Sequence, residues 1–402
     1  MTKNDANGLI ADLIAARKPG FALDQAFYSD PSVYARDIER VFMREWLYAG
    51  HASQIPKPGD YFLFEVAGES VIVVRGDDGE IRALVNVCRH RGSRVCYETR
   101  GNTSWFACPY HGWTYDLEGN LKASRLMPKD FDQSAHGLKR IHAAVFHGFI
   151  LINFADQPAS LDAAHRDLDD KLAPFALENA KIAHNEVYMI AANWKLALEN
   201  YQECYHCAPA HPEFAESHSI QRPDARNSKL MEALKVRAKE AGVSTEVVDC
   251  HGAEAGEPGF QYSYDRYALY PGFETGSQDG APVAPLMGDL RSFDGGASDL
   301  QLGALTYFLF YSDHGVVYRF TPHDVQSTEC EIVWLVRGDA EEGRDYDIER
   351  LKWLWEVTTI KDKMIIENNQ DGVNSRFYEP GPYAPMEKWC ARFVDWYIER
   401  IS

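Results

Sequence analysis

The chain has 402 residues, of which 45% are hydrophobic and 12% aromatic, and its formal net charge is −19 at pH 7. This composition indicates a folded globular protein that is long enough for two domains. The negative charge argues against DNA or RNA as a partner, because phosphate binding requires a basic surface. No apolar run is long enough to span a membrane and the N-terminus lacks a signal-peptide layout, so we expect a cytoplasmic protein.

The N-terminal half changes from helical to β-like patterns. Helical periodicity covers residues 9–18 and 32–48. From Tyr61 to Phe154, short runs such as YFLFEVAG and AVFHGFILINF are separated by Gly, Asp and Asn turns, as in an all-β module. We therefore predict N-terminal helices over residues 1–45 that pack on a catalytic domain, an all-β domain over 46–155 and the catalytic domain itself over 156–402.

The C-terminal half is mixed. A helical stretch near residues 161–179 precedes the strand EVYMIAA, and a helix LALENYQECYH is predicted to end before Pro209. Residues 225–300 are Gly-rich and predicted to be irregular. Strands return at ALTYFLFYS, GVVYRFTP and ECEIVWLVRG, and two helices follow, IERLKWLWEVTTIKDKMIIENNQ and MEKWCARFVDWYIERI. This order favours an α+β fold in which an antiparallel sheet wraps a long C-terminal helix, a helix-grip-like arrangement.

Two thiols and two imidazoles form the first candidate metal site. Cys88 and His90 are followed, after seventeen residues, by Cys108 and His111. Such a set can hold a [2Fe–2S] cluster, and two His in place of two Cys raise its potential. A Cys2His2 set also suits zinc. Zinc fingers usually pair like ligands, however, whereas here each half supplies one Cys and one His.

The remaining cysteines have no metal motif of this kind. In a reducing compartment we do not expect a disulfide framework. Six cysteines are accordingly predicted to be reduced and structural: Cys96, Cys204, Cys207, Cys250, Cys330 and Cys390.

The segments CRHRG and CPYHGWTYDLEG resemble the Rieske domain of Rieske non-haem iron oxygenases. The resemblance extends over nearly the whole chain, because Glu203, His206 and His211 have the spacing E-x2-H-x4-H. Positions 203 and 206 would share a helix face, and Pro209 is expected to end the helix and bring His211 back. Two His and a carboxylate form a facial triad that binds Fe(II) and leaves positions open for O2 and substrate.

The third iron ligand is expected from elsewhere in the chain. Asp362 lies on the long C-terminal helix, a short interval before Gln370 and Gly372, a context similar to that of the family's distal aspartate. Glu367 and Asp371 are the alternatives.

The resemblance also implies a role for Glu203. In the family, the acid three residues before the first iron His bridges that His to a Rieske His of the neighbouring subunit. Glu203 would then join His206 to His111 of another chain, which implies a homotrimer. Most relatives have Asp at this position, and Glu resembles the branch that oxidises quaternary ammonium compounds such as carnitine.

The phrases ENYQECYHCAPAHPEF, DGAPVAPLMG and NNQDGVNSRFYEPGPY are similar to glycine betaine monooxygenases and stachydrine demethylases. These enzymes oxidise an N-methyl group, and the carbinolamine loses formaldehyde. Neither G-x-G-x-x-G nor C-x4-C-x2-C occurs, so we expect electrons from a separate NAD(P)H-dependent reductase. The alternatives are a ring-hydroxylating oxygenase acting on an aromatic acid and a Rieske electron-transfer protein without catalysis.

A methylated ammonium substrate needs aromatic faces around it. An equal alternative for the aromatic residues between 260 and 273 is ordinary strand packing. The candidates are Tyr201, Tyr205, Phe260, Tyr262, Tyr264, Tyr267, Tyr270 and Phe273.

Overall fold

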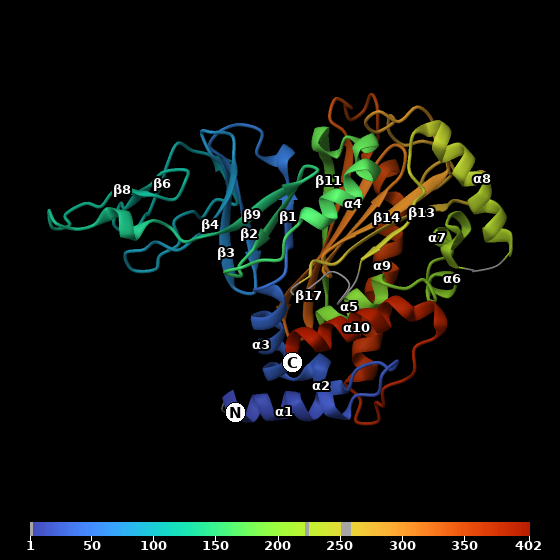
Figure 1. Cartoon of the computed structure of the whole chain (residues 1–402), viewed down its shortest axis with the longest axis horizontal. Coiled ribbons are helices and arrows are strands. Elements are labelled where there is room, and N and C mark those ends of the chain that lie inside the picture. Colours follow the sequence, from blue (N-terminus) through green and yellow to red (C-terminus); the bar gives the residue numbers. More distant parts are fainter. Residues whose placement is uncertain (1–2, 222–224, 251–258) are drawn as a thin grey trace. The chain divides into compact units, whose positions relative to one another are not determined.

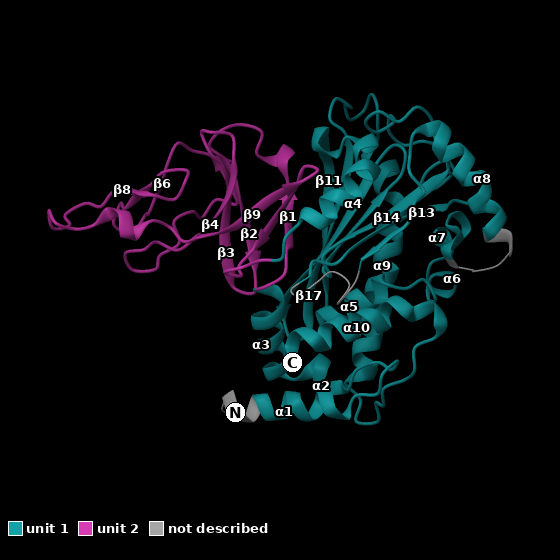
Figure 2. Ribbon diagram, viewed as in Figure 1, with its two compact units in different colours: residues 1–43, 159–402 teal, residues 44–158 magenta. Residues whose placement is uncertain are grey.

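A computed structural model describes residues 3–221, 225–250 and 259–402. The chain forms two compact units (Figure 2). Unit 2 comprises residues 44–158, and unit 1 comprises residues 1–43 together with 159–402. The N-terminal helices therefore belong to the same unit as the C-terminal part of the chain. No helix in the described ranges combines the length and the apolar character that a membrane crossing requires.

Unit 2 is an all-β unit. Its larger sheet has seven strands in the order β1-β10-β9-β4-β3-β2-β5, and its smaller one has the order β6-β7-β8. The run from Val71 to Val74 is fully buried, because β3 lies inside the sheet and is covered on both faces. The strands are β1 (Leu47–His51), β2 (Asp60–Val66), β3 (Glu69–Arg75), β4 (Ile81–Val85), β5 (Arg100–Asn102), β6 (Phe106–Ala107), β7 (Thr114–Tyr115), β8 (Leu121–Ala123), β9 (Arg140–Phe146) and β10 (Phe149–Asn153), with short helices η2 (Ala52–Gln54) and η3 (Gln133–His136).

Unit 1 combines helices with an antiparallel sheet of order β11-β17-β16-β15-β14-β13-β12. The long helix α9 packs along this sheet (Figure 1). The hydroxyls of Tyr318 on β16 and Thr359 on α9 lie 2.8 Å apart, and the Tyr318 ring contacts Trp355 of the same helix. The predicted α+β fold with a sheet around a long C-terminal helix is confirmed.

The described elements of unit 1 are helices and the strands of this one sheet. Its helices are α1 (Lys3–Ala16), α2 (Gln25–Ser29), α3 (Pro31–Asp37), η1 (Ile38–Phe42), α4 (Asp162–Leu172), η4 (Ala173–Phe175), η5 (Leu177–Asn179), α5 (Trp194–Tyr201), α6 (Cys207–Ala210), α7 (Pro212–Ser217), η6 (Ser219–Gln221), α8 (Ala225–Ala241), α9 (Ile348–Val373), η8 (Pro385–Glu387) and α10 (Lys388–Ile401). Its strands are β11 (Ala180–Ile190), β12 (Val248–Cys250), β13 (Tyr262–Ala268), β14 (Gly296–Leu302), β15 (Thr306–Phe310), β16 (Gly315–Asp324) and β17 (Ser327–Arg337).

Three secondary-structure predictions are wrong. The helix expected over 32–48 ends at Phe42, because residues 47–51 pair with β10 instead. Residues 225–300 are not irregular throughout, since they contain α8, β12, β13 and β14. The helix expected over 196–206 stops at Tyr201, and Pro209 lies inside the separate helix α6 rather than ending the first one.

A buried charge anchors the start of the segment that carries the second metal motif. The Asp37 carboxylate accepts hydrogen bonds from Trp194 Nε1 at 2.9 Å and from Tyr397 Oη at 2.7 Å, and it pairs with Lys195. Both members of the ion pair are fully buried, so removing either one would leave an uncompensated charge. These contacts tie α3 to α5 and α10, and Asn193 caps the start of α5.

Candidate functional site

In unit 2 the first motif lies on two loops with the same backbone pattern. The N–H of Gly92 donates to the carbonyl of Cys88 at 3.0 Å, and that of Gly112 to the carbonyl of Cys108 at 2.9 Å. The two glycines have φ angles of +80° and +72°, which residues with a Cβ rarely adopt. Each loop therefore turns tightly around its cysteine.

The side chains of the two loops meet in like pairs, thiol with thiol and imidazole with imidazole. Cys88 and Cys108 are buried and interact with each other. Nδ1 of His90 and Nδ1 of His111 lie 3.2 Å apart, and the His90 ring stacks on Trp113 at 4.8 Å. Two buried sulfurs and two more exposed imidazole nitrogens of the same type suit a [2Fe–2S] cluster with one iron on each ligand pair.

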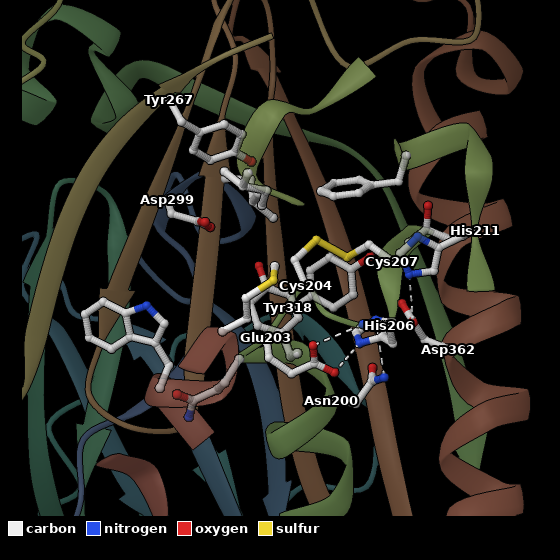
Figure 3. A pocket seen from close by; sticks show the side chains of 18 of the residues that line it. Asn200, Glu203, Cys204, His206, Cys207, His211, Tyr267, Asp299, Tyr318 and Asp362 are labelled. Atoms are coloured by element: carbon white, nitrogen blue, oxygen red, sulfur yellow. Dashed lines mark hydrogen bonds and ion pairs between the residues drawn. A yellow bond between two sulfur atoms is a disulfide. The ribbon is translucent and has the colours of Figure 1, made fainter. Parts of the chain in front are cut away.

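In unit 1 the second motif converges on Asp362. His206 and His211 flank the short helix α6, and Asp362 lies on α9. Oδ1 of Asp362 is 3.3 Å from Nε2 of His206 and 3.2 Å from Nε2 of His211 (Figure 3). Ligands bound at about 2.1 Å to one ion, side by side, lie about 3 Å apart, so these three atoms fit a common metal. Two imidazoles and one carboxylate suit non-haem Fe(II).

The two alternative acids do not join this cluster. Glu367 accepts a hydrogen bond from the Ala191 N–H at 2.9 Å and pairs with Lys363. Asp371 is exposed on α9. The donor set among the described residues therefore has one carboxylate, that of Asp362.

The prediction that Cys204 and Cys207 are reduced is wrong. They form a disulfide across a turn that brings their Cα atoms within 4.9 Å. The prediction rested on the expected compartment and took no account of this local proximity. Cys207 also lies beside His206 and His211, but its sulfur is already bonded to Cys204. The other cysteines predicted to be reduced are free: Cys96, Cys250, Cys330 and Cys390.

Glu203 lies behind His206. Its Oε1 accepts a hydrogen bond from Nδ1 of His206 at 2.5 Å, and its Oε2 accepts from the backbone N–H groups of Tyr205 and His206. The imidazole of His206 therefore lies between two carboxylates. Burial acts to lower the pKa of His206, but the hydrogen bonds to Asp362 and Glu203 outweigh it and raise this pKa to about 9.

A cavity of about 500 Å³ in unit 1 contains this triad. Of the eight aromatic candidates, Tyr201 and Tyr267 line it. Tyr262 and Tyr264 instead donate hydrogen bonds to Asp167 and to the carbonyl of Ser244, which agrees with the alternative of strand packing. Tyr205 is exposed.

Two acids that line the same cavity were missed. Asp265 on β13 and Asp299 on β14 are direct cross-strand neighbours. The available signal was an aspartate inside each strand, a position where this residue is uncommon. It was hidden because the strand β14 itself was not predicted.

Residues 45–140 match the family model described as Rieske [2Fe-2S] domain, and residues 177–402 match that of the ring hydroxylating alpha subunit (catalytic domain). The glycine betaine monooxygenase oxygenase subunit of Chromohalobacter salexigens is 38% identical over 98% of this chain and 89% of that protein. The carnitine monooxygenase oxygenase subunit of Acinetobacter pittii is 31% identical over 52% of this chain and 58% of that protein.

Among solved structures, that of the quaternary ammonium Rieske monooxygenase CntA with an inhibitor is similar to this chain. Its TM-score is 0.75 at 22% identity, over 97% of this chain and 98% of that chain. At this identity the likeness shows the fold alone.

The triad predicts which acid holds iron. Asp362→Asn should lower the mononuclear iron content by at least about tenfold, because the amide brings no charge to the metal, while the visible spectrum of the cluster stays unchanged. Iron and acid-labile sulfide assays on the purified protein measure both. The matched variants Glu367→Gln and Asp371→Asn should keep their iron. Full iron in Asp362→Asn, or its loss in Glu367→Gln, would contradict the assignment.

The disulfide predicts a thiol count. Protein denatured without a reductant should expose the six cysteines that are free, and protein denatured with a reductant should expose all eight. A chromogenic thiol reagent gives both numbers. Equal counts under the two conditions would show that Cys204 and Cys207 are reduced in the purified protein.

Proposed function

Because this chain belongs to the family of ring-hydroxylating oxygenase alpha subunits that carry a Rieske [2Fe–2S] domain, we propose that it removes an N-methyl group from glycine betaine or a close quaternary ammonium relative. One observation carries this substrate class: the match to a glycine betaine monooxygenase subunit extends over 98% of this chain. The match to a carnitine monooxygenase subunit extends over only 52%.

The metal ligands are proposed from the two clusters of side chains. Cys88, His90, Cys108 and His111 would hold the [2Fe–2S] cluster, and His206, His211 and Asp362 the mononuclear iron. When bound, the cluster supplies electrons one at a time and the iron activates O2. The protein orients the ligands: burial acts to raise the pKa of Asp362, but the hydrogen bonds from the two histidines keep it below its usual range, so the carboxylate remains ionised.

The proposed reaction is a monooxygenation. One atom of O2 enters a C–H bond of an N-methyl group, and the other is reduced to water by two electrons and two protons. The hydroxymethyl ammonium then loses its O–H proton, and the C–N bond breaks with its electron pair going to nitrogen. The products are formaldehyde and a tertiary amine. As an oxygenase component, the chain acts on a small molecule and receives electrons from a reductase.

We further propose that the electrons pass between chains of a homotrimer, from His111 of one chain through Glu203 to His206 of the next. Glu203 already binds the imidazole of His206, and a carboxylate between two imidazoles fixes both. Each unit has exposed apolar side chains that could form part of a subunit interface. They are Tyr205, Ile360 and Met364 in unit 1, and Trp105 and Tyr110 in unit 2. The proposed compartment is the cytoplasm, where NAD(P)H is available to the reductase.

Turnover tests the substrate class. With a reductase, NAD(P)H and O2, glycine betaine should yield formaldehyde and dimethylglycine in equal amounts, and Asp362→Asn should yield neither. Carnitine, stachydrine and benzoate are the comparison substrates, followed by mass spectrometry. Hydroxylation of benzoate without formaldehyde from any methylated ammonium compound would overturn the proposal in favour of a ring hydroxylase.

Mixed oligomers test the path between chains. His90→Ala disables the cluster and His206→Ala disables the iron, so each variant alone should be inactive. Co-expressed with different affinity tags and purified through both, they should regain part of the activity, because an intact cluster then faces an intact iron on another chain. Doubly tagged oligomers without activity would show that electrons stay within one chain.

A further inference from the structure

We propose that Asp265 and Asp299, here called the acid pair, form the site that receives the quaternary ammonium group of the substrate on the sheet wall of the iron cavity. This inference rests on the proposed function, since it names the part of the same cavity that recognises the cation.

The acid pair is placed by the register of two strands. Asp265 on β13 is directly opposite Asp299 on β14, so both carboxylates lie on the same face of the sheet. The next residue on that face of β13 is Tyr267. All three line the cavity that also contains His206, His211 and Asp362. Figure 3 shows Asp299 and Tyr267 directed into this cavity.

The carboxylates of the acid pair are open to the cavity that they line: Asp265 is exposed and Asp299 is half-buried. No hydrogen bond or ion pair from the described residues reaches either carboxylate. Asp294 in the same unit shows the normal pattern: it is 1% exposed, forms an ion pair with Arg266 and accepts a hydrogen bond from Ser312. Unlike the carboxylate of Asp294, those of the acid pair are therefore available to a molecule that enters the cavity.

A second, independent observation comes from the neighbouring tyrosines. Tyr267 is 6% exposed, and its hydroxyl is buried with no hydrogen-bond partner in the part of the chain that the structure describes. The hydroxyl of Tyr201, which also lines the cavity, is in the same situation. Buried polar groups for which the protein itself provides no partner indicate where a bound molecule makes contacts.

The chemistry of the wall fits an organic cation. A quaternary ammonium group cannot donate a hydrogen bond, so it is held by negative charge and by aromatic side chains. The wall supplies both, through the acid pair and through Tyr201, Tyr267 and Tyr318. A hard metal ion would require about six oxygen ligands, more than the two carboxylates here offer.

The protonation of the acid pair agrees with this assignment. Partial desolvation in the cavity raises the pKa of Asp265 to about 6, although the charge of Lys388 acts to lower it, and desolvation together with the charge of Asp265 raises the pKa of Asp299 to about 8. A cation favours the ionised forms, so affinity for it should rise between about pH 6 and pH 8. Tyrosines form most of the other titratable groups near the acid pair: Tyr264 and Tyr267 on β13, Tyr201 on α5, Tyr307 on β15, and Tyr311. The charged groups are Lys388 on α10 and the ion pair of Asp249 on β12 with Arg392.

Two probes that each reproduce one part of glycine betaine separate the effect of the charge from that of the shape. Tetramethylammonium carries the cation alone, and 3,3-dimethylbutanoate is glycine betaine with carbon in place of nitrogen. Calorimetric titration of the purified holoprotein, without a reductase, measures both affinities. Asp265→Asn and Asp299→Asn should each weaken tetramethylammonium binding by at least about tenfold and leave 3,3-dimethylbutanoate binding unchanged or stronger. Asp299→Glu should restore part of the loss, and the exposed control Asp371→Asn should change neither affinity.

Unchanged tetramethylammonium affinity in both Asn variants, or an equal loss for both probes, would overturn the assignment. If either variant fails to fold, the wild-type protein still decides: its tetramethylammonium affinity must rise from pH 6 to pH 8 while that for 3,3-dimethylbutanoate does not. Formaldehyde release from glycine betaine with unaltered binding in the variants would refute the acid pair and keep the function. Weakened binding in the variants, with no turnover of any methylated ammonium compound, would keep the acid pair as a cation site and refute the proposed function.

Discussion

The catalytic unit depends on one imidazole held between two carboxylates. His206 contacts Asp362 through Nε2 and Glu203 through Nδ1. The first contact joins the turn before α6 to α9, elements more than 150 residues apart in the chain. The second fixes the orientation of the ring, as a carboxylate does behind a metal-bound histidine. This arrangement brings the proposed electron path and the proposed iron site to the same side chain.

The local sequence explains why the chain can present His206 in this way. The helix α5 stops at Tyr201, and the Glu203 carboxylate then accepts hydrogen bonds from the N–H groups of Tyr205 and His206. The side chain therefore shapes the turn whose histidine it also orients. Glutamate has one methylene more than aspartate, which gives it the reach for both tasks. Upstream, the buried contacts of Asp37 hold the beginning of α5.

Features encoded by residues close together in the chain could be predicted from the sequence, whereas features that join distant segments could not. Cys88, His90, Cys108 and His111 were identified because each pair lies within a single loop with a recognisable spacing. Asp362 required a resemblance, since nothing local separates it from Glu367 on the same helix. The disulfide was missed because a general expectation about compartments replaced a local one. The acid pair was missed because strand register, which joins Asp265 to Asp299, cannot be read from either segment alone.

The same reasoning explains how the cavity divides its tasks. The ligands of the proposed iron site come from the turn around α6 and from α9, whereas the acid pair comes from the sheet. Reactive and recognising groups therefore stand on different elements. Substitutions in the strands β13 and β14 can then change which class of substrate binds without altering the geometry of the metal ligands.

The most direct test of the central claim is a single-turnover measurement on the reduced oxygenase. The cluster is reduced in the absence of O2, the protein is mixed with O2 and glycine betaine, and oxidation of the cluster is followed by its absorbance. Glu203→Gln should slow this oxidation by at least about tenfold at full metal occupancy, because the amide cannot replace a carboxylate behind His206. The matched variant Glu213→Gln, which alters an acid paired with Lys361, should react at the wild-type rate. A wild-type rate in Glu203→Gln would contradict the account.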